Sequence, residues 1–243
     1  YFYFANDFPE TEKAFGGADV DLFAYVQAPR VIWISKWKFL GGCYGADALF
    51  PFAYQDLEIG SASWDDFNLG DIFIEPATLS WHTARLDAGI GYGFWAPTGD
   101  FDKNSPLNPG KGYWGHMLTA GATFYFDKEK SWAFSALNRY EFNHENPDTD
   151  STPGQVWTVE WGFNKTFNKT VDVGVVGYYQ AQTTCDSGDN TIDDRDAVVG
   201  IGPELNWAFP KCMFFASLRY VYEIEANDRP QGHTLNLTLT KRF

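Results

Sequence analysis

The stretch Leu237–Phe243, LTLTKRF, decides the fold. Leucines at positions 237 and 239 alternate with threonines at 238 and 240, and the aromatic Phe243 stands last. Alternation with a period of two is typical of a β-strand that has one apolar and one polar face. A soluble domain usually ends in a frayed polar tail. This ending therefore predicts a strand that is held in place up to its last residue.

The same alternation recurs along nearly the whole chain. In residues 155–164, QVWTVEWGFN, large apolar side chains alternate with small or polar ones. About twelve strands are expected, at 1–6, 20–36, 43–57, 67–81, 85–96, 113–126, 132–143, 156–166, 171–182, 197–209, 213–225 and 234–243. Most of these segments have the length, about 10 residues, that a tilted strand needs to cross a bilayer.

The connections between these segments alternate in length. Short ones lie at 82–83, 127–130, 167–170 and 209–212, and long ones, rich in acidic residues, Gly, Pro and Asn, at 97–112, 144–154 and 183–196. Outer-membrane barrels have short periplasmic turns and longer extracellular loops. We expect one domain, residues 1–243, that forms a transmembrane up-and-down antiparallel β-barrel of about 12 strands, with both termini at the short-turn end.

Composition agrees with a membrane barrel. Aromatic residues make up 19% of the chain and charged residues 21%, and no run approaches the 18 apolar residues of a membrane helix. Tryptophans 81, 132, 157 and 207 fall near predicted strand ends, where interfacial aromatic residues are expected. The net charge of −14 argues against nucleic acid as a partner. The opening YFYFAN, without Met or a basic region, indicates a mature or trimmed form.

The three cysteines, Cys43, Cys185 and Cys212, show no metal-binding spacing. They are interpreted as free structural thiols, with a disulfide between two of them as the alternative. No metal or other cofactor is expected.

Alternation also predicts which side chains face the lumen. The residues expected to line a pore or solute path are Phe23, Tyr25, Trp33, Arg85, Asp87, Arg139, Glu141, Glu160, Asp172, Tyr178, Glu204, Phe215 and Arg219. Carboxylates outnumber arginines in this set, and several members are aromatic. Such an amphipathic wall suits small, partly apolar solutes. Arg–carboxylate pairing as packing of the lumen is the alternative.

Glycines and prolines mark irregular places in the wall. Glycines 89, 91 and 93 would leave space in the lumen or mark a curved strand. Prolines 29, 51, 76 and 203 interrupt good strands, and a proline cannot donate to the ladder. Each should produce a bulge or a local gap. One such gap is hypothesised to be a side door that releases apolar solutes into the membrane.

Catalytic and metal motifs are weak. The four histidines, at 82, 116, 144 and 233, have no diagnostic spacing to a serine, and no GxSxG occurs. A barrel hydrolase with Ser and His on neighbouring strands stays open as a minor alternative. The acidic loop 186–196 does not match the EF-hand spacing. It is expected to be a solvated loop that divalent cations can bridge to lipopolysaccharide.

Two segments resemble a known family. FNLGDIFIEPATLSWH, residues 67–82, matches it at Leu69, Gly70, Asp71, Pro76, Leu79 and Trp81, and the blocks 91–102 and 108–126 match at 96–99 and 112–114. These motifs resemble proteobacterial outer-membrane channels named for the meta-cleavage pathway of phenol degradation. The resemblance implies a channel for small hydrophobic or aromatic compounds, and no catalytic residue. Asn68 departs from the family's usual Gly, and by simple alternation Asp71 would point outward.

Together these features predict an outer-membrane diffusion channel for small hydrophobic or aromatic molecules, not an enzyme. The alternatives are a plugged structural or adhesive barrel and, less favoured, a hydrolase. Expected partners are membrane lipid, lipopolysaccharide, the solute, and the barrel-assembly machinery, which would read the last strand ending at Phe243.

Overall fold

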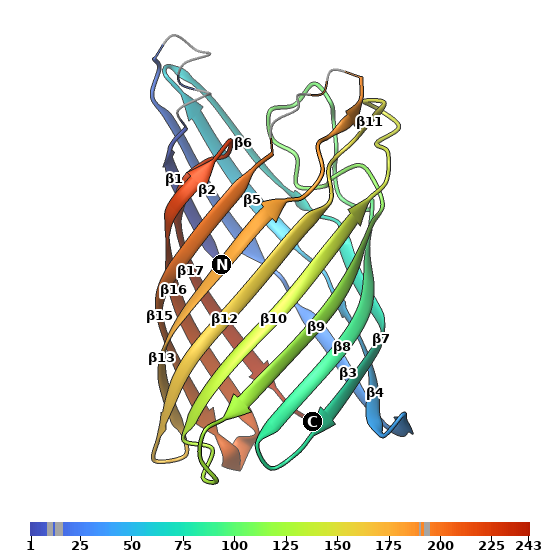
Figure 1. Cartoon of the computed structure of the whole chain (residues 1–243). Coiled ribbons are helices and arrows are strands. Elements are labelled where there is room, and N and C mark those ends of the chain that lie inside the picture. The colour runs from blue at the N-terminus through green and yellow to red at the C-terminus, as the bar shows by residue number, and fades with distance from the viewer. Residues whose placement is uncertain (9–11, 13–16, 190, 192–194) are drawn as a thin grey trace.

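The computed structural model describes residues 1–8, 12, 17–189, 191 and 195–243, and shows a tilted antiparallel barrel (Figure 1). Its main strands are β1 (Phe2–Asp7), β2 (Val20–Gln27), β3 (Arg30–Phe39), β4 (Gly42–Leu49), β5 (Phe52–Ile59), β6 (Ala62–Leu69), β7 (Ile72–His82), β8 (Leu86–Ala96), β9 (Gly115–Tyr125), β10 (Trp132–Asn143), β12 (Val156–Phe167), β13 (Val171–Gln182), β15 (Ala197–Phe209), β16 (Phe214–Asn227) and β17 (Gln231–Lys241). A two-stranded ribbon, β11 (Ser151–Thr152) with β14 (Ser187–Gly188), joins two loops, and a short 3₁₀ turn, η1 (Pro210–Cys212), precedes β16.

The fifteen elements of the main sheet amount to twelve wall strands. Elements β2 and β3, β4 and β5, and β6 and β7 are halves of three long strands, separated by only two residues each. The hydrogen-bonded order runs from β3 through β4, β7 and β8 around to β17, β1, β2, β5 and β6. This order starts at β3, which is the continuation of β2, and ends at β6, which continues into β7. The sheet therefore closes into a barrel, and β1 pairs with both β17 and β2.

The prolines produce the irregularities that the sequence predicts. Pro29 and Pro51 stand in the breaks between β2 and β3 and between β4 and β5. Pro76 lies in a bulge of β7, where the register shifts against both neighbouring strands. At Pro203 the ladder between β15 and β16 is interrupted while the register is kept. A missing N–H donor is thus placed where the ladder is already broken.

The two ends of the barrel differ, as expected. Short turns between β3 and β4, β7 and β8, β9 and β10, β12 and β13, and β15 and β16 lie at the lower end in Figure 1, and the long loops at the upper end. The C-terminus is at the short-turn end, but Tyr1 lies about halfway up the wall. The prediction that both termini share one end was wrong, because β1 pairs with only the upper part of β17. The described part of the chain contains no helix long and apolar enough for a membrane span.

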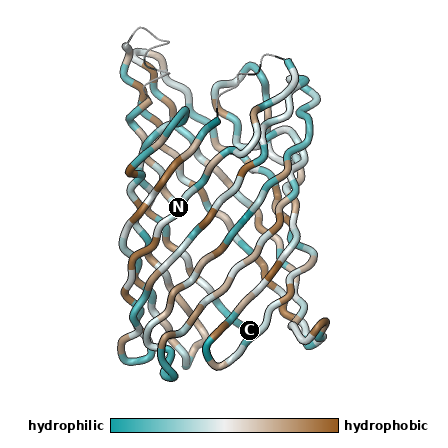
Figure 2. Tube along the Cα trace, viewed as in Figure 1, coloured by the Kyte–Doolittle hydropathy of each residue, from teal (hydrophilic) through white to brown (hydrophobic). Residues whose placement is uncertain are grey.

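The wall has an apolar outer face. On β17, Leu235, Leu237 and Leu239 point outward and are 38%, 56% and 60% exposed, while Asn236 and Thr238 between them point inward. Figure 2 shows hydrophobic and hydrophilic positions alternating along the strands, with hydrophilic residues gathered in the upper loops. Side chains that would form a core in a soluble sandwich are here turned to the surroundings.

The glycines of β8 make room for neighbouring side chains. A Cβ at Gly93 would collide with the ring of Phe73, and a Cβ at Gly91 would collide with Glu75 and Thr119. Phe73 is 4% exposed. The space that these glycines leave is therefore filled by Phe73 and Glu75 from β7 and by Thr119 from β9, beside the bulge that Pro76 creates.

We expect Gly93→Ala to destabilise the barrel by about 1–3 kcal/mol, because the added methyl group overpacks against Phe73. Gly89→Ala is the matched control, since its Cβ would meet only the Leu79 carbonyl at an ordinary 3.4 Å. Urea unfolding in detergent, followed by tryptophan fluorescence, measures both variants. Equal stability of the two would contradict this account of the glycines.

Candidate functional site

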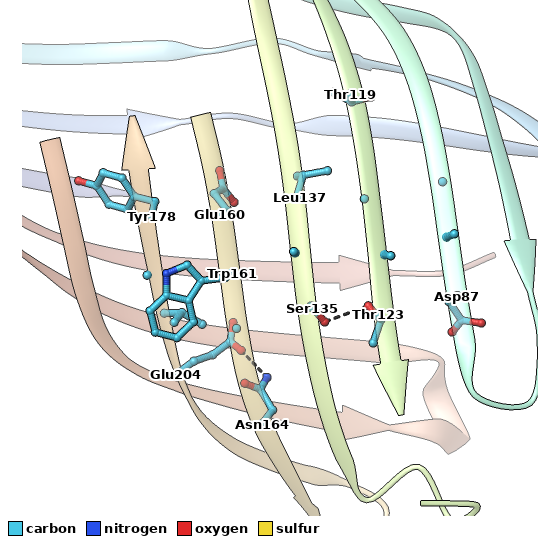
Figure 3. A pocket seen from close by; sticks show the side chains of 18 of the residues that line it. Asp87, Thr119, Thr123, Ser135, Leu137, Glu160, Trp161, Asn164, Tyr178 and Glu204 are labelled. Atoms are coloured by element: carbon cyan, nitrogen blue, oxygen red, sulfur yellow. Dashed lines mark hydrogen bonds between the residues drawn. The ribbon is translucent and has the colours of Figure 1, made fainter. Parts of the chain in front are cut away.

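The lumen holds a cavity of about 740 Å³ lined from β7 around to β17. In Figure 3, Asp87, Glu160, Tyr178 and Glu204 are among the side chains that line this cavity. Aliphatic side chains such as Leu137, Val176 and Val221 share the wall with hydroxyl groups such as those of Thr123 and Ser135, which are 2.9 Å apart. The wall is therefore mixed, with apolar patches between neutral hydrogen-bonding groups.

A carboxylate network lies on the β15–β16 side of this cavity. Arg219 Nε donates to Glu204 Oε1, and Asn164 Nδ2 donates to Glu204 Oε2 at 2.7 Å. Glu204 is 3% exposed. Asn164 reaches it across Gly174, where a Cβ would collide with the Asn164 amide. The absence of a side chain on β13 thus allows a contact between β12 and β15.

Two further ion pairs cross the inner wall. Arg139 Nη2 lies 2.5 Å from Glu160 Oε1. Arg30 makes a bidentate pair with Asp47 at 2.8 and 2.9 Å, and its Nη2 also lies 3.5 Å from Glu75 Oε2. The charge of each of these arginines is balanced by a paired carboxylate. The net negative charge of the inner wall therefore comes from the carboxylates that have no basic partner.

Glu223 is the most buried carboxylate, at 2% exposure. It accepts hydrogen bonds from the hydroxyl groups of Tyr178 at 2.6 Å and Tyr3 at 3.0 Å, and from the Gly232 amide at 2.6 Å. These partners come from β13, β1 and β17. The carboxylate therefore ties together the strands at which the barrel closes.

Loop 97–114 is fastened to the wall by Asp71. This side chain, 4% exposed, accepts hydrogen bonds from the amides of Gly99 at 2.9 Å and Lys111 at 2.8 Å. The backbones of Gly99 and Gly110 touch, because a Cβ on either would lie 2.6 Å from the other residue. Asp71 stands in the break between β6 and β7. Simple alternation along a strand would point Asp71 outward, but the residue lies outside both strands, so that expectation does not apply to it.

The loop also carries a cation to the upper rim of the lumen. Lys111 Nζ lies 3.2 Å from Glu141 and above the ring of Trp95, 5.3 Å from its centroid. Burial, and then the nearby carboxylates of Glu141, Asp71 and Asp186, raise the pKa of the Tyr113 hydroxyl to about 12. The phenol is therefore neutral at physiological pH.

A second cavity, of about 310 Å³, lies at the short-turn end. Its wall includes Asp172, Asn206, Phe215, Thr238 and Thr240. Within the described residues, no group of three or more His, Cys, Asp or Glu side chains could hold a metal ion.

The structure places most predicted pore residues on the inner wall. Asp87, Glu160, Tyr178, Glu204 and Arg219 line the large cavity, and Asp172 and Phe215 line the small one. Arg139 and Glu141 reach the same wall through their ion pairs with Glu160 and Lys111. Arg85 is exposed in the turn between β7 and β8, outside both strands. Whether solutes contact any of these residues stays a prediction.

Three predicted pore residues face outward instead, so their expected orientation was wrong. Phe23 and Tyr25 contact Phe4 and Phe2, while Ala24 between them pairs with the inward Tyr3. The inner face of β2 is apolar here too, because Val20 packs with Ala5 and Phe8. Polarity therefore could not distinguish its two sides.

Trp33 is the third of these residues. It contacts Trp37 and Tyr44 on the face opposite Arg30 and Asp47. The alternation keeps its phase across the break at Pro29, because Ala24 and Arg30 both face inward. The same wrong choice of face for this strand therefore misplaced Trp33 together with Phe23 and Tyr25.

The sequence pattern missed several inner-wall residues. Arg30, Glu75, Lys111 and Tyr3 each contact a carboxylate or a polar group inside the barrel. Arg30 follows Pro29 and Glu75 precedes Pro76. For Glu75 the neighbouring Pro76 was the available signal, because a bulge there shifts the alternation of β7 by one residue.

Comparisons with known proteins agree with this architecture. Residues 5–239 match the family described as "Putative MetA-pathway of phenol degradation". The chain belongs to this family. The crystal structure of an outer membrane channel from Pseudomonas putida F1 superimposes with a TM-score of 0.83 at 17% identity, over 100% of this chain and 93% of that one. The fold is therefore that of a bacterial outer-membrane β-barrel, and the fold predicted from the sequence is confirmed. The comparison with curated proteins found no match.

We expect Asp71→Ala to release loop 97–114 in this member of the family. The change leaves the amides of Gly99 and Lys111 without their partner, which costs about 1–3 kcal/mol for each buried group. Trypsin should then cut the folded protein within the loop, at Lys103 or Lys111. Asp65→Ala, at an exposed position on β6, is the control and should leave the loop resistant. A resistant loop in Asp71→Ala would refute the fastening role.

Proposed function

We propose that this family member is an outer-membrane channel through which small hydrophobic or aromatic molecules diffuse. The observation that carries the proposal is the mixed wall of the 740 Å³ cavity inside a closed barrel. Apolar side chains can contact a ring or an alkyl chain, and hydroxyl groups replace part of its water shell. The shared fold of an outer-membrane channel supports the same function.

The positions of the histidines favour transport over catalysis. His116 stacks with Tyr92, and His233 stacks with Phe4, both on the outer face. His82 lies at the end of β7 and pairs with Asp87 at 3.1 Å. A hydrolase would need a histidine beside a nucleophile in a place where substrate gathers. The proposed channel needs no cofactor.

The apolar outer face fits membrane lipid. Solutes would enter between the upper loops, cross the large cavity and leave at the short-turn end. Lateral release through the wall into the membrane, at one of the proline sites, is an alternative exit route in this proposal. Recognition by the assembly machinery and bridging of the acidic loop to lipopolysaccharide stay predictions, and positions 190 and 192–194 of that loop lie outside the described residues.

Conductance separates the channel from a plugged structural barrel. We expect the purified protein to give discrete single-channel currents in planar bilayers with a weak preference for cations, because carboxylates outnumber basic groups on the inner wall. Reversal potentials in a salt gradient measure this preference, and Asp172→Asn should reduce it. Clear anion selectivity would contradict the charge argument, and no current at all would favour the plug.

Uptake tests the solute class. Cells that express the protein should take up a labelled monoaromatic compound faster than cells without it, since the compound bypasses the polar lipopolysaccharide layer. A bulky side chain beside a proline break, such as Ala53→Trp near Pro51, tests lateral release. Slower uptake with unchanged conductance would support the lateral route. Unchanged uptake would remove it.

A further inference from the structure

We propose that Asn206 forms the selectivity step of the lumen, and that this step favours neutral solutes able to form hydrogen bonds. This inference rests on the proposed channel function. Among the described residues, Asn206 is the one that lines both the large cavity and the small one. A solute that moves from the first to the second therefore passes its amide.

The register places Asn206 in a polar row across the wall. Asp172 on β13 pairs with Asn206 on β15, Asn206 with Ser217 on β16, and Ser217 with Thr238 on β17. Residues directly opposite each other on neighbouring strands share one face of the sheet. We call these four residues the polar belt. They present carboxylate, amide and hydroxyl groups side by side on the inner wall.

The belt has unused hydrogen-bonding capacity. The hydroxyl oxygen of Ser217 is buried and has no partner among the described residues, and within the same residues the Asn206 amide makes no side-chain hydrogen bond. In the neighbouring row, Arg219 and Asn164 both donate to Glu204, and one buried acceptor, Asn164 Oδ1, has no partner among the described residues. The Asn206 amide is half-buried and open to both cavities, whereas an unsatisfied buried group such as the Ser217 hydroxyl is rare in native proteins and calls for an explanation. We infer that a passing solute or water molecule satisfies them.

The chemistry of the belt defines the solute class. A molecule that leaves water loses hydrogen bonds, and an amide offers it both a donor and an acceptor in return. A neutral molecule with a hydroxyl or amide group regains those bonds at Asn206. An anion at Asn206 would meet the neighbouring carboxylate of Asp172. The large cavity accepts the apolar part of a solute. The polar belt then discriminates between solutes by whether their polar group is neutral and can form hydrogen bonds.

Three variants test the step in reconstituted liposomes and planar bilayers. Asn206→Leu keeps the side-chain volume and removes the hydrogen bonds. Erythritol, which does not cross lipid readily, should then enter liposomes about fivefold more slowly, the factor that one net hydrogen bond represents. Asn206→Trp should abolish most of the single-channel conductance. Leu205→Trp, one residue away and directed outward, is the matched control and should keep wild-type conductance.

The outcomes distinguish this inference from the channel proposal. If the wild-type protein conducts no ions and admits no erythritol, the channel proposal itself fails. If the wild type conducts but Asn206→Leu and Asn206→Trp behave like it, only the selectivity step is overturned. Heat-modifiable migration on gels establishes that each variant is folded before its transport is measured.

Discussion

Closure of the backbone ladder is the constraint on which the rest of this structure depends. In hydrocarbon, each unpaired backbone N–H or C=O group costs several kcal/mol. The wall meets this demand by circular pairing, with β1 joining β17 to β2. Prolines are admitted only where the ladder is already interrupted, at strand breaks, at a bulge and at a local gap. The prolines in the sequence and the interruptions of the backbone ladder therefore coincide.

A closed wall with an apolar outer face leaves the lumen as the site for charge. Burying an ion without a partner is costly, and pairing repays the cost only with good geometry. The buried inner carboxylates Glu204, Asp47 and Glu223 follow this rule: Glu204 has Arg219 and Asn164, Asp47 has Arg30, and Glu223 has two tyrosine hydroxyls and an amide. The same groups that satisfy one another also fix the shape of the cavity. Structural packing and a solute path are thus two aspects of one wall.

The sequence predicted the architecture better than the orientation of individual side chains. Alternation and loop lengths are local properties, and they were sufficient for the strand count and the two unlike ends. Long regular strands such as β12, β13 and β16 kept their predicted faces, so Glu160, Tyr178 and Arg219 were placed correctly on the inner wall. On β2 and β3 the alternation was regular but was assigned to the wrong face, because both faces carry apolar residues. On β7 the bulge at Pro76 shifts the alternation by one residue. The first cause misplaced Trp33 and hid Arg30, and the second hid Glu75.

Contacts across strands lay beyond prediction for a further reason. Tyr178 reaches Glu223 over Gly200, where a Cβ would lie 2.7 Å from the tyrosine ring, and Asn164 reaches Glu204 over Gly174. Each contact needs a large residue, a glycine and a carboxylate on three successive strands at matching register. One sequence gives these residues but not their registers, which depend on the bulges and turns between them. The shape of the lumen thus depends on these glycines as much as on the large side chains that reach across them.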